Sequence, residues 1–411
     1  EDVRALSLSR NGKTLVFEYD FCLWKVGVDG KGLAQIPIQI VSDLKGEDVE
    51  TRTLTEGLES FDLSPSGKTV VFELRGDLWR MMASGGPAVR LTSGSARDEW
   101  PRFSPDGKWV AFQSDRTGNH DLFIMPVRGG EPTRVTNHPK DDFYHRWFPD
   151  GKSLVFTSER SGNREIWAQN LKSGEARQLT RHSAADDDAV VSPDGKMIAF
   201  DSGRTGKQEI WVMGVDGSNP TQLTQHGLFS QVPAWSPDGK RLAYEVIRER
   251  SSSVWVLDLA TKATLQITGD GSQAQFSPDG QWLYVLSSRG REAKRLYRLP
   301  APQKILGGEE VPVMANSRVD LAQERRQVFE EAWMALKNGF YDPKFHGIDW
   351  DAMKAKYLPL ATNARTNQEL VTLLHRMAGE LKASHVGAWG PSRIPNRVST
   401  GYLGAEIVAS S

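Results

Sequence analysis

Near the C-terminal end of the sequence, a serine and a histidine stand side by side as Ser384 and His385, directly after an apolar helical pattern. An imidazole has a pKa of about 6.5, so at neutral pH it can take the proton of a serine hydroxyl and return it to a leaving amine. The same pair is also an ordinary turn sequence after a helix. From the residues alone, general-base catalysis and a structural turn both stay open.

A second set of residues with chemical potential is a series of arginines at regular intervals. Guanidinium groups bind carboxylates through two parallel hydrogen bonds, so a ring of them could capture peptide carboxylates and steer chain ends. The alternative is internal pairing, because Asp121, Glu165 and Glu209 recur five residues after three of these arginines. The arginines are Arg116, Arg160, Arg204, Arg248 and Arg289, and the first four are spaced by 44 residues.

Histidines and cysteines indicate neither a metal site nor a disulfide. Cys22 stands alone, which excludes an intrachain disulfide and a thiolate zinc cluster. None of the 8 histidines has His-Glu-x-x-His or comparable ligand spacing, and we expect His346 and His375 to be structural. The sequence therefore predicts no metal and no cofactor.

A repeat with a period near 44 residues must position the arginines. The tetrad Ser-Pro-Asp-Gly, or a near copy, recurs seven times, and each copy carries four short β-branched or alternating runs divided by turn residues such as Asp106-Gly107. Four strands per repeat predict a mainly β fold over 1–314, a seven-bladed β-propeller with the arginines on one rim, rather than a solenoid or sandwich. The tetrads end at Gly12, Gly67, Gly107, Gly151, Gly195, Gly239 and Gly280.

Helical periodicity follows the predicted propeller and continues to the Ser-His pair. The first amphipathic helix is expected to end at Gly339 or at the following Asp342-Pro343, and a second should follow Trp350. Thr366 and Glu369 form a capping box for a third helix, whose apolar residues make one stripe. The three helices predict a small α-helical bundle subdomain over 315–386, which is small enough to need a docking partner.

The composition excludes several classes of function. Lys and Arg number 51 against 52 Asp and Glu, and hydrophobic residues make up 38%, which is typical of a globular protein and not of a basic nucleic-acid binder. No run of about 18 apolar residues occurs, so we expect no membrane partner. The balanced charge likewise predicts no nucleic-acid partner. Because the chain starts at Glu1 rather than at Met, we expect it to have been cut from a longer polypeptide.

The repeat and the helical segment together resemble the tricorn-type serine peptidases, relatives of the tail-specific processing peptidases. Ser-Pro-Asp-Gly-Lys followed by an aliphatic-aromatic strand is similar to the propeller repeats of tricorn peptidases and of the TolB periplasmic protein. Three more specific elements stand in the family's order: Phe-Tyr-Asp-Pro at 340–343, His-Gly-Ile-Asp-Trp-Asp at 346–351 and Glu-Leu-x-x-Ser-His at 380–385. The resemblance covers almost the whole chain.

The resemblance implies a segment of a peptidase that hydrolyses oligopeptides, with the propeller as substrate gate or channel. Carried over from the family pattern, His385 is the general base and Ser384 supports it. The five arginines are candidate substrate-binding residues on the ground of their own spacing and chemistry. The family's nucleophilic serine and oxyanion hole lie in a further domain, behind a PDZ-like module that 387–411 would begin after a linker. The chain alone is therefore expected to be inactive.

The resemblance also suggests a homo-oligomer and a cytoplasmic location, with the periplasm as the alternative. A second hypothesis stays open, in which the chain is a non-enzymatic β-propeller scaffold or binding protein whose helices merely resemble the peptidase. No Gly-x-Ser-x-Gly elbow occurs, which argues against a propeller-bearing prolyl oligopeptidase. A PDZ-like domain and a serine in a small-residue turn downstream would favour the enzyme.

Overall fold

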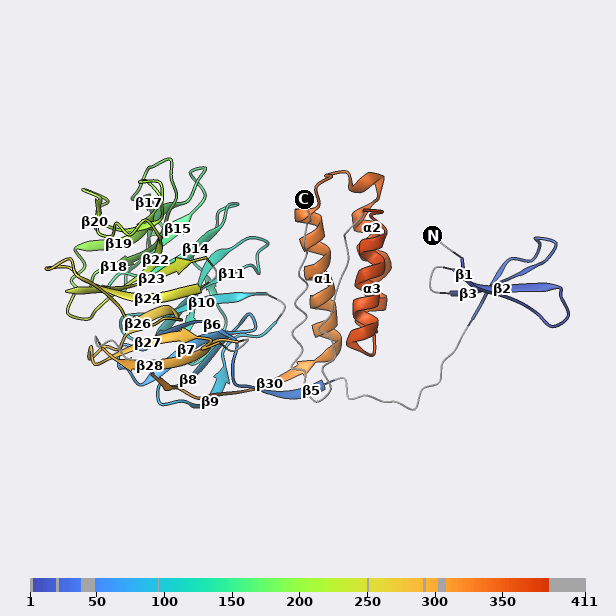
Figure 1. Ribbon diagram of the computed structural model, residues 1–411, viewed down its shortest axis with the longest axis horizontal. Coiled ribbons are helices and arrows are strands. Elements are labelled where there is room, and N and C mark those ends of the chain that lie inside the picture. Colours follow the sequence, from blue (N-terminus) through green and yellow to red (C-terminus); the bar gives the residue numbers. More distant parts are fainter. Residues whose placement is uncertain are drawn as a thin grey trace. The chain divides into compact units, whose positions relative to one another are not determined.

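The computed structural model describes residues 3–19, 22–37, 49–94, 96–249, 251–290, 293–301 and 308–383. The chain divides into two units, residues 1–48 and residues 49–411. The first unit contains one small sheet, and the second contains a ring of sheets followed by helices (Figure 1).

The sheet of the first unit has four antiparallel strands in sequence order. Phe17 lies opposite Trp24 on the neighbouring strand, and Tyr19 packs edge-on against Trp24 with ring centroids 6.5 Å apart. No described residue of this unit is fully buried, so the sheet has no hydrophobic core of its own. Its strands are β1 (Arg4–Leu8), β2 (Thr14–Tyr19), β3 (Cys22–Gly27) and β4 (Ala34–Ile36).

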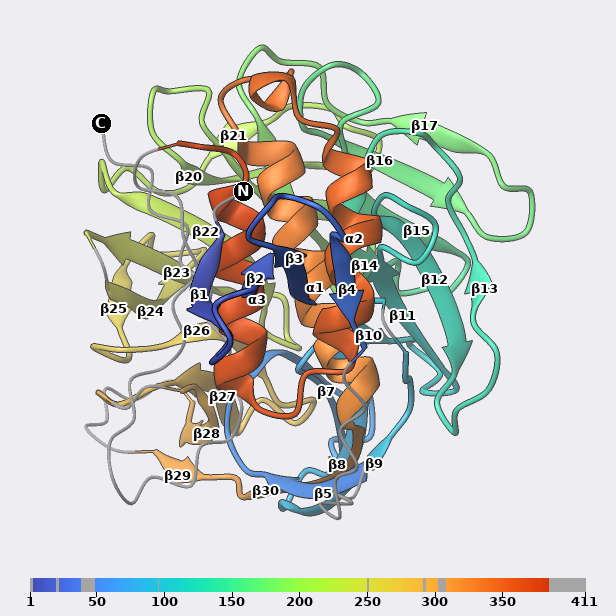
Figure 2. The same ribbon diagram turned by 90° about the vertical axis from the view of Figure 1, so that its right-hand side faces the viewer.

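Six sheets of the second unit form a closed ring around a common axis (Figure 2). The last sheet returns to the first, because Gln275 Nε2 donates to Asp62 Oδ1 over 2.6 Å and Leu63 N donates to Gln275 Oε1 over 3.0 Å. A buried apolar cluster that includes Leu58 and Leu286 joins the same two sheets. The innermost strands are β6 (Leu58–Leu63), β10 (Asp98–Phe103), β14 (Asp142–Trp147), β18 (Asp186–Val191), β22 (Phe229–Trp235) and β26 (Ser272–Phe276).

The second strand of each sheet carries the most buried apolar side chains, because neighbouring sheets cover both of its faces. Phe112, Phe156 and Phe200 recur every 44 residues on these strands and are fully buried. The second strands are β7 (Thr69–Leu74), β11 (Trp109–Ser114), β15 (Ser153–Ser158), β19 (Met197–Ser202), β23 (Arg241–Arg248) and β27 (Trp282–Ser287). The third strands are β8 (Asp77–Met82), β12 (Asp121–Pro126), β16 (Glu165–Asn170), β20 (Glu209–Gly214), β24 (Ser251–Asp258) and β28 (Arg295–Pro300). The outermost strands are β9 (Gly86–Arg90), β13 (Thr133–Arg134), β17 (Ala176–Gln178), β21 (Thr221–Gln222), β25 (Thr264–Gln266) and β29 (Glu309–Glu310).

The repeated Ser-Pro-Asp-Gly tetrad makes the turn between the first two strands of a sheet. Ser104 Oγ donates to Asp106 Oδ1 over 2.6 Å, and the same carboxylate oxygen accepts from Lys108 N over 3.0 Å. Gly107 has φ +69°, a conformation that glycine adopts without steric cost. The tetrad therefore repeats because each sheet needs this tight turn.

The predicted seven blades are present as seven sheets, but the ring itself contains six of them. β26 packs directly against β6, so the last sheet closes on the second predicted blade and not on the first. The predicted first blade lies in the separate unit of residues 1–48. The sequence marks this break, because Gly12 and Gly67 are 55 residues apart whereas the later tetrads are 40 to 44 apart. A single seven-bladed ring over 1–314 is therefore corrected to a six-bladed ring.

The strand that leads into the ring and the strand that leaves it pair with each other. β5 (Val49–Leu54) runs antiparallel to β30 (Val313–Asp320), and β30 also pairs in parallel with β9. Leu54, Val313 and Ala315 are buried in the apolar cluster that closes the ring. This two-stranded ribbon therefore holds the two chain ends of the propeller together on the outer strand of its first sheet.

Three α-helices follow the ribbon and pack against one another (Figure 1). Asp320 caps the first helix by accepting from Ala322 N and Gln323 N, and that helix ends at Gly339 as predicted. Thr366 Oγ1 accepts from Glu369 N over 3.1 Å, which confirms the first bond of the capping box. The helices are α1 (Leu321–Gly339), the 3-10 helix η1 (Phe345–Gly347), α2 (Trp350–Thr362) and α3 (Asn367–Gly379).

Candidate functional site

The predicted catalytic residues Ser384 and His385 lie outside the described residues, which end one residue before this pair. The chain that leads to the pair is firmly held by the helices. Leu381 is fully buried, and the Glu380 carboxylate accepts from the Tyr357 hydroxyl over 2.7 Å. The helical subdomain therefore fixes the backbone immediately before the Ser-His sequence.

His346 in η1 binds the same segment. Its Nδ1 lies 2.8 Å from the carbonyl oxygen of Leu381, and its Nε2 lies 2.6 Å from the hydroxyl of Tyr341. Because a carbonyl can only accept, Nδ1 carries the proton and Nε2 accepts from the tyrosine hydroxyl. His346 thus anchors the backbone four residues before His385 in the sequence, whereas His375 is exposed on α3.

Three of the rim arginines form internal ion pairs with an aspartate that precedes each of them by 18 residues. The pairing expected with Asp121, Glu165 and Glu209 is wrong, because these carboxylates bind Arg134, Thr180 and Thr224 instead. Each aspartate is fully or almost fully buried, and each guanidinium also lies over two aromatic rings. The pairs are Arg116–Asp98 at 2.7 Å, Arg160–Asp142 at 2.6 Å and Arg204–Asp186 at 2.5 Å.

The two remaining rim arginines have different surroundings. Arg248 is exposed and lies over the ring of Trp255. Arg289 lies over the ring of Tyr297 at 3.8 Å and donates from Nη2 to the carbonyl of Gly308 over 2.8 Å. The five arginines therefore do not share one environment, and three of them brace their own sheets.

The acidic residues that seemed suited to the arginines bind the recurring threonines or a different arginine. Asp121 pairs with Arg134, and Glu165 Oε2 accepts from Thr180 Oγ1 over 2.6 Å. The threonine hydroxyl in turn accepts from the backbone N–H of Ile166 over 2.9 Å. The same bond to a backbone N–H of the third strand recurs at five threonines spaced 44 residues apart, namely Thr92, Thr136, Thr180, Thr224 and Thr268.

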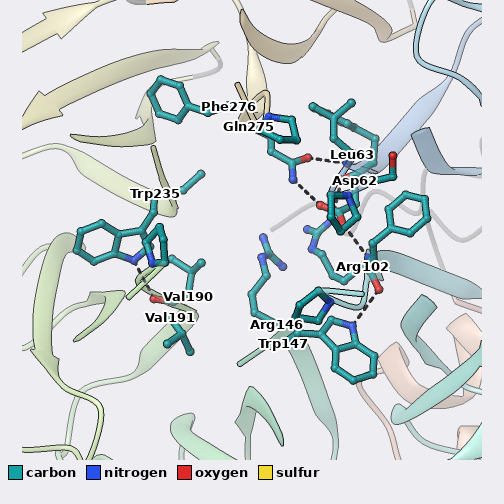
Figure 3. Close-up of a pocket in the computed structure, with 18 of the residues that line it drawn as sticks. Asp62, Leu63, Arg102, Arg146, Trp147, Val190, Val191, Trp235, Gln275 and Phe276 are labelled. Atoms are coloured by element: carbon teal, nitrogen blue, oxygen red, sulfur yellow. Dashed lines mark hydrogen bonds between the residues drawn. The ribbon is translucent and has the colours of Figure 1, made fainter. Parts of the chain in front are cut away.

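A cavity of about 290 Å³ lies on the axis of the ring, between the innermost strands of all six sheets (Figure 3). Its wall is polar where β6, β10, β14 and β26 line it, and apolar where β18 and β22 do. Figure 3 shows the guanidinium groups of Arg102 and Arg146 directed into the cavity, with Val190 and Trp235 on the opposite side. The arrangement suits a ligand with one anionic and one apolar part.

Burial perturbs the charged groups of this cavity. Burial is the main cause that raises the pKa of Asp62, whose carboxylate accepts from Phe103 N over 2.7 Å and from Gln275 Nε2. Burial, followed by repulsion from Arg146, lowers the pKa of Arg102 to about 9. Both shifts show that the cavity wall holds charge at a cost in solvation free energy.

A second feature of the axial cavity, which the sequence did not predict, is a backbone-to-side-chain hydrogen bond that joins neighbouring sheets. Five innermost strands contain a residue with φ between 50° and 55°, and in four of them its N–H turns toward a polar side chain on the second strand of the preceding sheet. Tyr144 N donates to Gln113 Oε1 over 3.1 Å, and Gln273 N donates to the Glu245 carboxyl. A polar residue directly after the buried aromatic residue of the second strand, as in Phe72-Glu73 and Phe112-Gln113, is the pattern that reveals it. The acceptors are Glu73, Gln113, Asp201 and Glu245.

Replacing Glu245→Gln is expected to stabilise the propeller at alkaline pH. Burial raises the pKa of Glu245 from 4.5 to about 7, so the folded state holds this proton more tightly than the unfolded state. The stabilising contribution is therefore complete below pH 4.5 and is lost as the pH rises through 7. Glutamine keeps the acceptor for Gln273 N, as Gln113 does in its own sheet, and should raise the free energy of unfolding at pH 8 by about 1–2 kcal/mol. Urea denaturation at pH 5 and pH 8 measures both values.

The matched control is Glu131→Gln, which removes one negative charge from an exposed loop away from the channel. It should leave the difference in unfolding free energy between pH 5 and pH 8 unchanged. An unchanged pH difference in Glu245→Gln would contradict the link between this carboxyl and stability.

Within the described residues, no cluster of three or more His, Cys, Asp or Glu side chains is arranged to hold a metal ion. None of the described helices is both long enough and apolar enough to cross a membrane.

Comparison with known protein families relates both parts of the second unit to one family. The description "Tricorn protease N-terminal beta propeller domain" matches residues 63–165 and 162–306. The description "Tricorn protease C1 domain" matches residues 321–379. The first match covers the ring and the second covers the three helices.

Individual proteins give the same result over parts of the chain. The chain is 27% identical over 148 residues to "Tricorn protease homolog 1" of Streptomyces coelicolor, which is 34% of this chain and 13% of that protein. The crystal structure of the tricorn protease matches with a TM-score of 0.64 at 16% identity, over 93% of this chain and 46% of that chain. TolB from Acinetobacter baumannii matches with a TM-score of 0.52 at 19% identity, over 75% of this chain and 81% of that chain. The chain thus spans a small part of the curated relative and less than half of the tricorn protease chain, and the structural likenesses concern the fold.

Proposed function

The chain belongs to the tricorn protease family, and from that premise we propose that it is the propeller and half-site segment of a serine peptidase that hydrolyses oligopeptides. Its family matches make it a peptidase-associated segment. The observation that carries the proposal is the order of the parts: the propeller match at 63–306 is followed by the C1 match at 321–379, and this leads directly to Ser384 and His385.

On this proposal, His385 is the general base of the peptidase. Its imidazole takes the proton from the hydroxyl of a nucleophilic serine that a further domain supplies, and later gives that proton to the leaving amine. Ser384 supports the histidine in this network. The contacts of Leu381 with His346 and of Glu380 with Tyr357 support the proposal, because they anchor the backbone that carries the base.

The ring of sheets acts, on the same proposal, as a gate for peptide substrates. Support comes from the cavity on its axis, which combines guanidinium groups with an apolar wall. The rim arginines contribute less than the sequence suggests, because Arg116, Arg160 and Arg204 already bind buried aspartates. We further propose a multi-subunit assembly in the cytoplasm.

The test compares the 411-residue chain with the longer polypeptide that contains it. The longer polypeptide should hydrolyse fluorogenic oligopeptides and should be labelled by a serine-directed fluorophosphonate, whereas the 411-residue chain should do neither. Mass spectrometry of the labelled protein locates the nucleophile. Hydrolysis by the 411-residue chain alone, or hydrolysis that resists the fluorophosphonate, would contradict the proposal.

A further inference from the structure

We propose that Arg102 and Arg146 form a binding site for a peptide carboxylate inside the axial cavity of the ring. The site differs from the rim arginines that the sequence singled out, and it lies on the innermost strands β10 and β14. That the ligand is a peptide rests on the proposed function. That the ligand presents a carboxylate follows from the two side chains and their surroundings.

The first argument is that both guanidinium groups lack an acidic partner. Arg102 is 4% exposed, and its Nη1 donates to the carbonyl oxygens of Phe61 and Pro101 at 2.7 and 2.9 Å while its Nε has no partner. Arg146 Nη1 donates to the carbonyl oxygen of His145 at 3.0 Å. Within the described residues, no carboxylate lies within 4.0 Å of either guanidinium. A charge buried without a partner is strongly disfavoured, so an anion that reaches it gains the missing interaction.

The second argument is the contrast with three other arginines of the same ring. Arg116, Arg160 and Arg204 each meet a buried aspartate at 2.5 to 2.7 Å. The fold therefore supplies an acidic partner where an arginine only braces a sheet. Arg102 and Arg146 lack an acidic partner and repel each other. The cavity therefore leaves room for a carboxylate that accepts two parallel hydrogen bonds from a guanidinium group.

The third argument concerns the nearest carboxyl groups of the cavity. Asp62 accepts from two neutral donors, Phe103 N and Gln275 Nε2, and acts on Arg102 through its charge without an ion pair within 4.0 Å. Asp188 on β18 acts on Arg146 only through its more distant charge. These two acids moderate the positive potential without filling the position, so we expect reversible binding of a carboxylate.

The fourth argument is the size and the opposite wall of the cavity. A volume of about 290 Å³ accommodates the end of an extended peptide or one acidic side chain, and it excludes a folded partner. Val190 and Trp235 lie across from the arginines, and Val232, on the same strand as Trp235, also lines the cavity. This wall can pack against apolar side chains while the carboxylate faces the guanidinium pair.

The experiment measures binding of N-acetylated tri-alanine to the 411-residue chain by isothermal titration calorimetry. The free acid should bind at least about tenfold more tightly than the same peptide with a C-terminal amide, because the charge-assisted bonds to the arginines are lost. Arg146→Gln should weaken binding of the free acid by about 10- to 100-fold, and Arg146→Lys should weaken it less. Arg128→Gln, which removes an exposed charge outside the cavity, should bind as the wild type does.

A third peptide identifies the source of the carboxylate. An acetylated, amidated tripeptide with a central glutamate should bind like the amide if the site takes chain ends, and like the free acid if it takes acidic side chains; either result supports carboxylate recognition. Equal affinity of the free acid and the plain amide in the wild-type chain would overturn the proposal, and this test needs no variant to fold. Peptide hydrolysis by the longer polypeptide without such discrimination would leave the peptidase function standing and the cavity site refuted.

Discussion

Replacing His385→Ala in the longer polypeptide is expected to lower kcat for oligopeptide hydrolysis by about four orders of magnitude. Without the imidazole, no group accepts the proton of the nucleophilic serine or returns it to the leaving amine. Binding of substrate should persist, because the loss concerns the transition state and not the ground state. Initial rates over a range of peptide concentrations separate kcat from KM.

His375→Ala is the matched control for this variant, since His375 is exposed on α3 and should leave turnover unchanged. Ser384→Ala should lower kcat by a smaller amount than His385→Ala, because it removes only a supporting group. Near-normal turnover of His385→Ala would show that the base has been assigned to the wrong residue, whatever the family match.

Replacing Trp350→Ala is expected to destabilise the helical subdomain by about 3–5 kcal/mol, the usual cost of removing a large buried aromatic side chain. Trp350 is 3% exposed and stacks on Phe345 with ring centroids 5.5 Å apart. It also exchanges two hydrogen bonds with Trp333, whose Nε1 donates to the Trp350 carbonyl over 2.9 Å while Trp350 Nε1 donates back over 3.1 Å. Urea denaturation followed by circular dichroism at 222 nm gives the change in stability.

Two comparisons show whether packing or hydrogen bonding dominates at this position. Trp350→Phe keeps an aromatic ring but loses the bond to Trp333, so it should cost about 1–2 kcal/mol. Met334→Ala truncates an exposed side chain of α1 and should have little effect. In the longer polypeptide, Trp350→Ala should also lose peptide hydrolysis as its helices unfold, because the helical subdomain positions the proposed base His385. A variant with unchanged unfolding free energy would contradict this account of the helical core.

The features that the sequence could predict are those set by neighbouring residues. The Ser-Pro-Asp-Gly turn closes through a bond between residues two apart, as in Ser104 and Asp106, so its repetition reveals the strands. Helix ends are similarly local, and Thr366 and Glu369 predict the start of α3 correctly. Periodicity and capping therefore predicted the mainly β ring and the helices that follow it.

The features that escaped prediction depend on residues far apart in the chain. Ring closure requires Gln275 to meet Asp62, which lies 213 residues earlier, so counting tetrads could not decide which sheet closes the ring. Arg116 binds Asp98 rather than Asp121, although both are register partners of Ser114, because Asp121 already pairs with Arg134 from the fourth strand. Arg102 and Arg146 are also 44 residues apart, but the equivalent positions of the other innermost strands carry Asp62, Val190, Ala234 and Gln275, so only the folded ring shows that the six residues face one cavity.

The ribbon of β5 and β30 has a mechanical consequence. Val49 and Asp320 are register partners, so tension applied through the flanking chain enters and leaves the propeller at one point. Pulling on Val49 and Asp320 separates the paired residues of β5 and β30 one pair at a time, starting with these two. Until the last pair, Leu54 and Ala315, separates, the force does not reach the sheets of the ring. The axial cavity therefore keeps its shape while neighbouring parts of the polypeptide move.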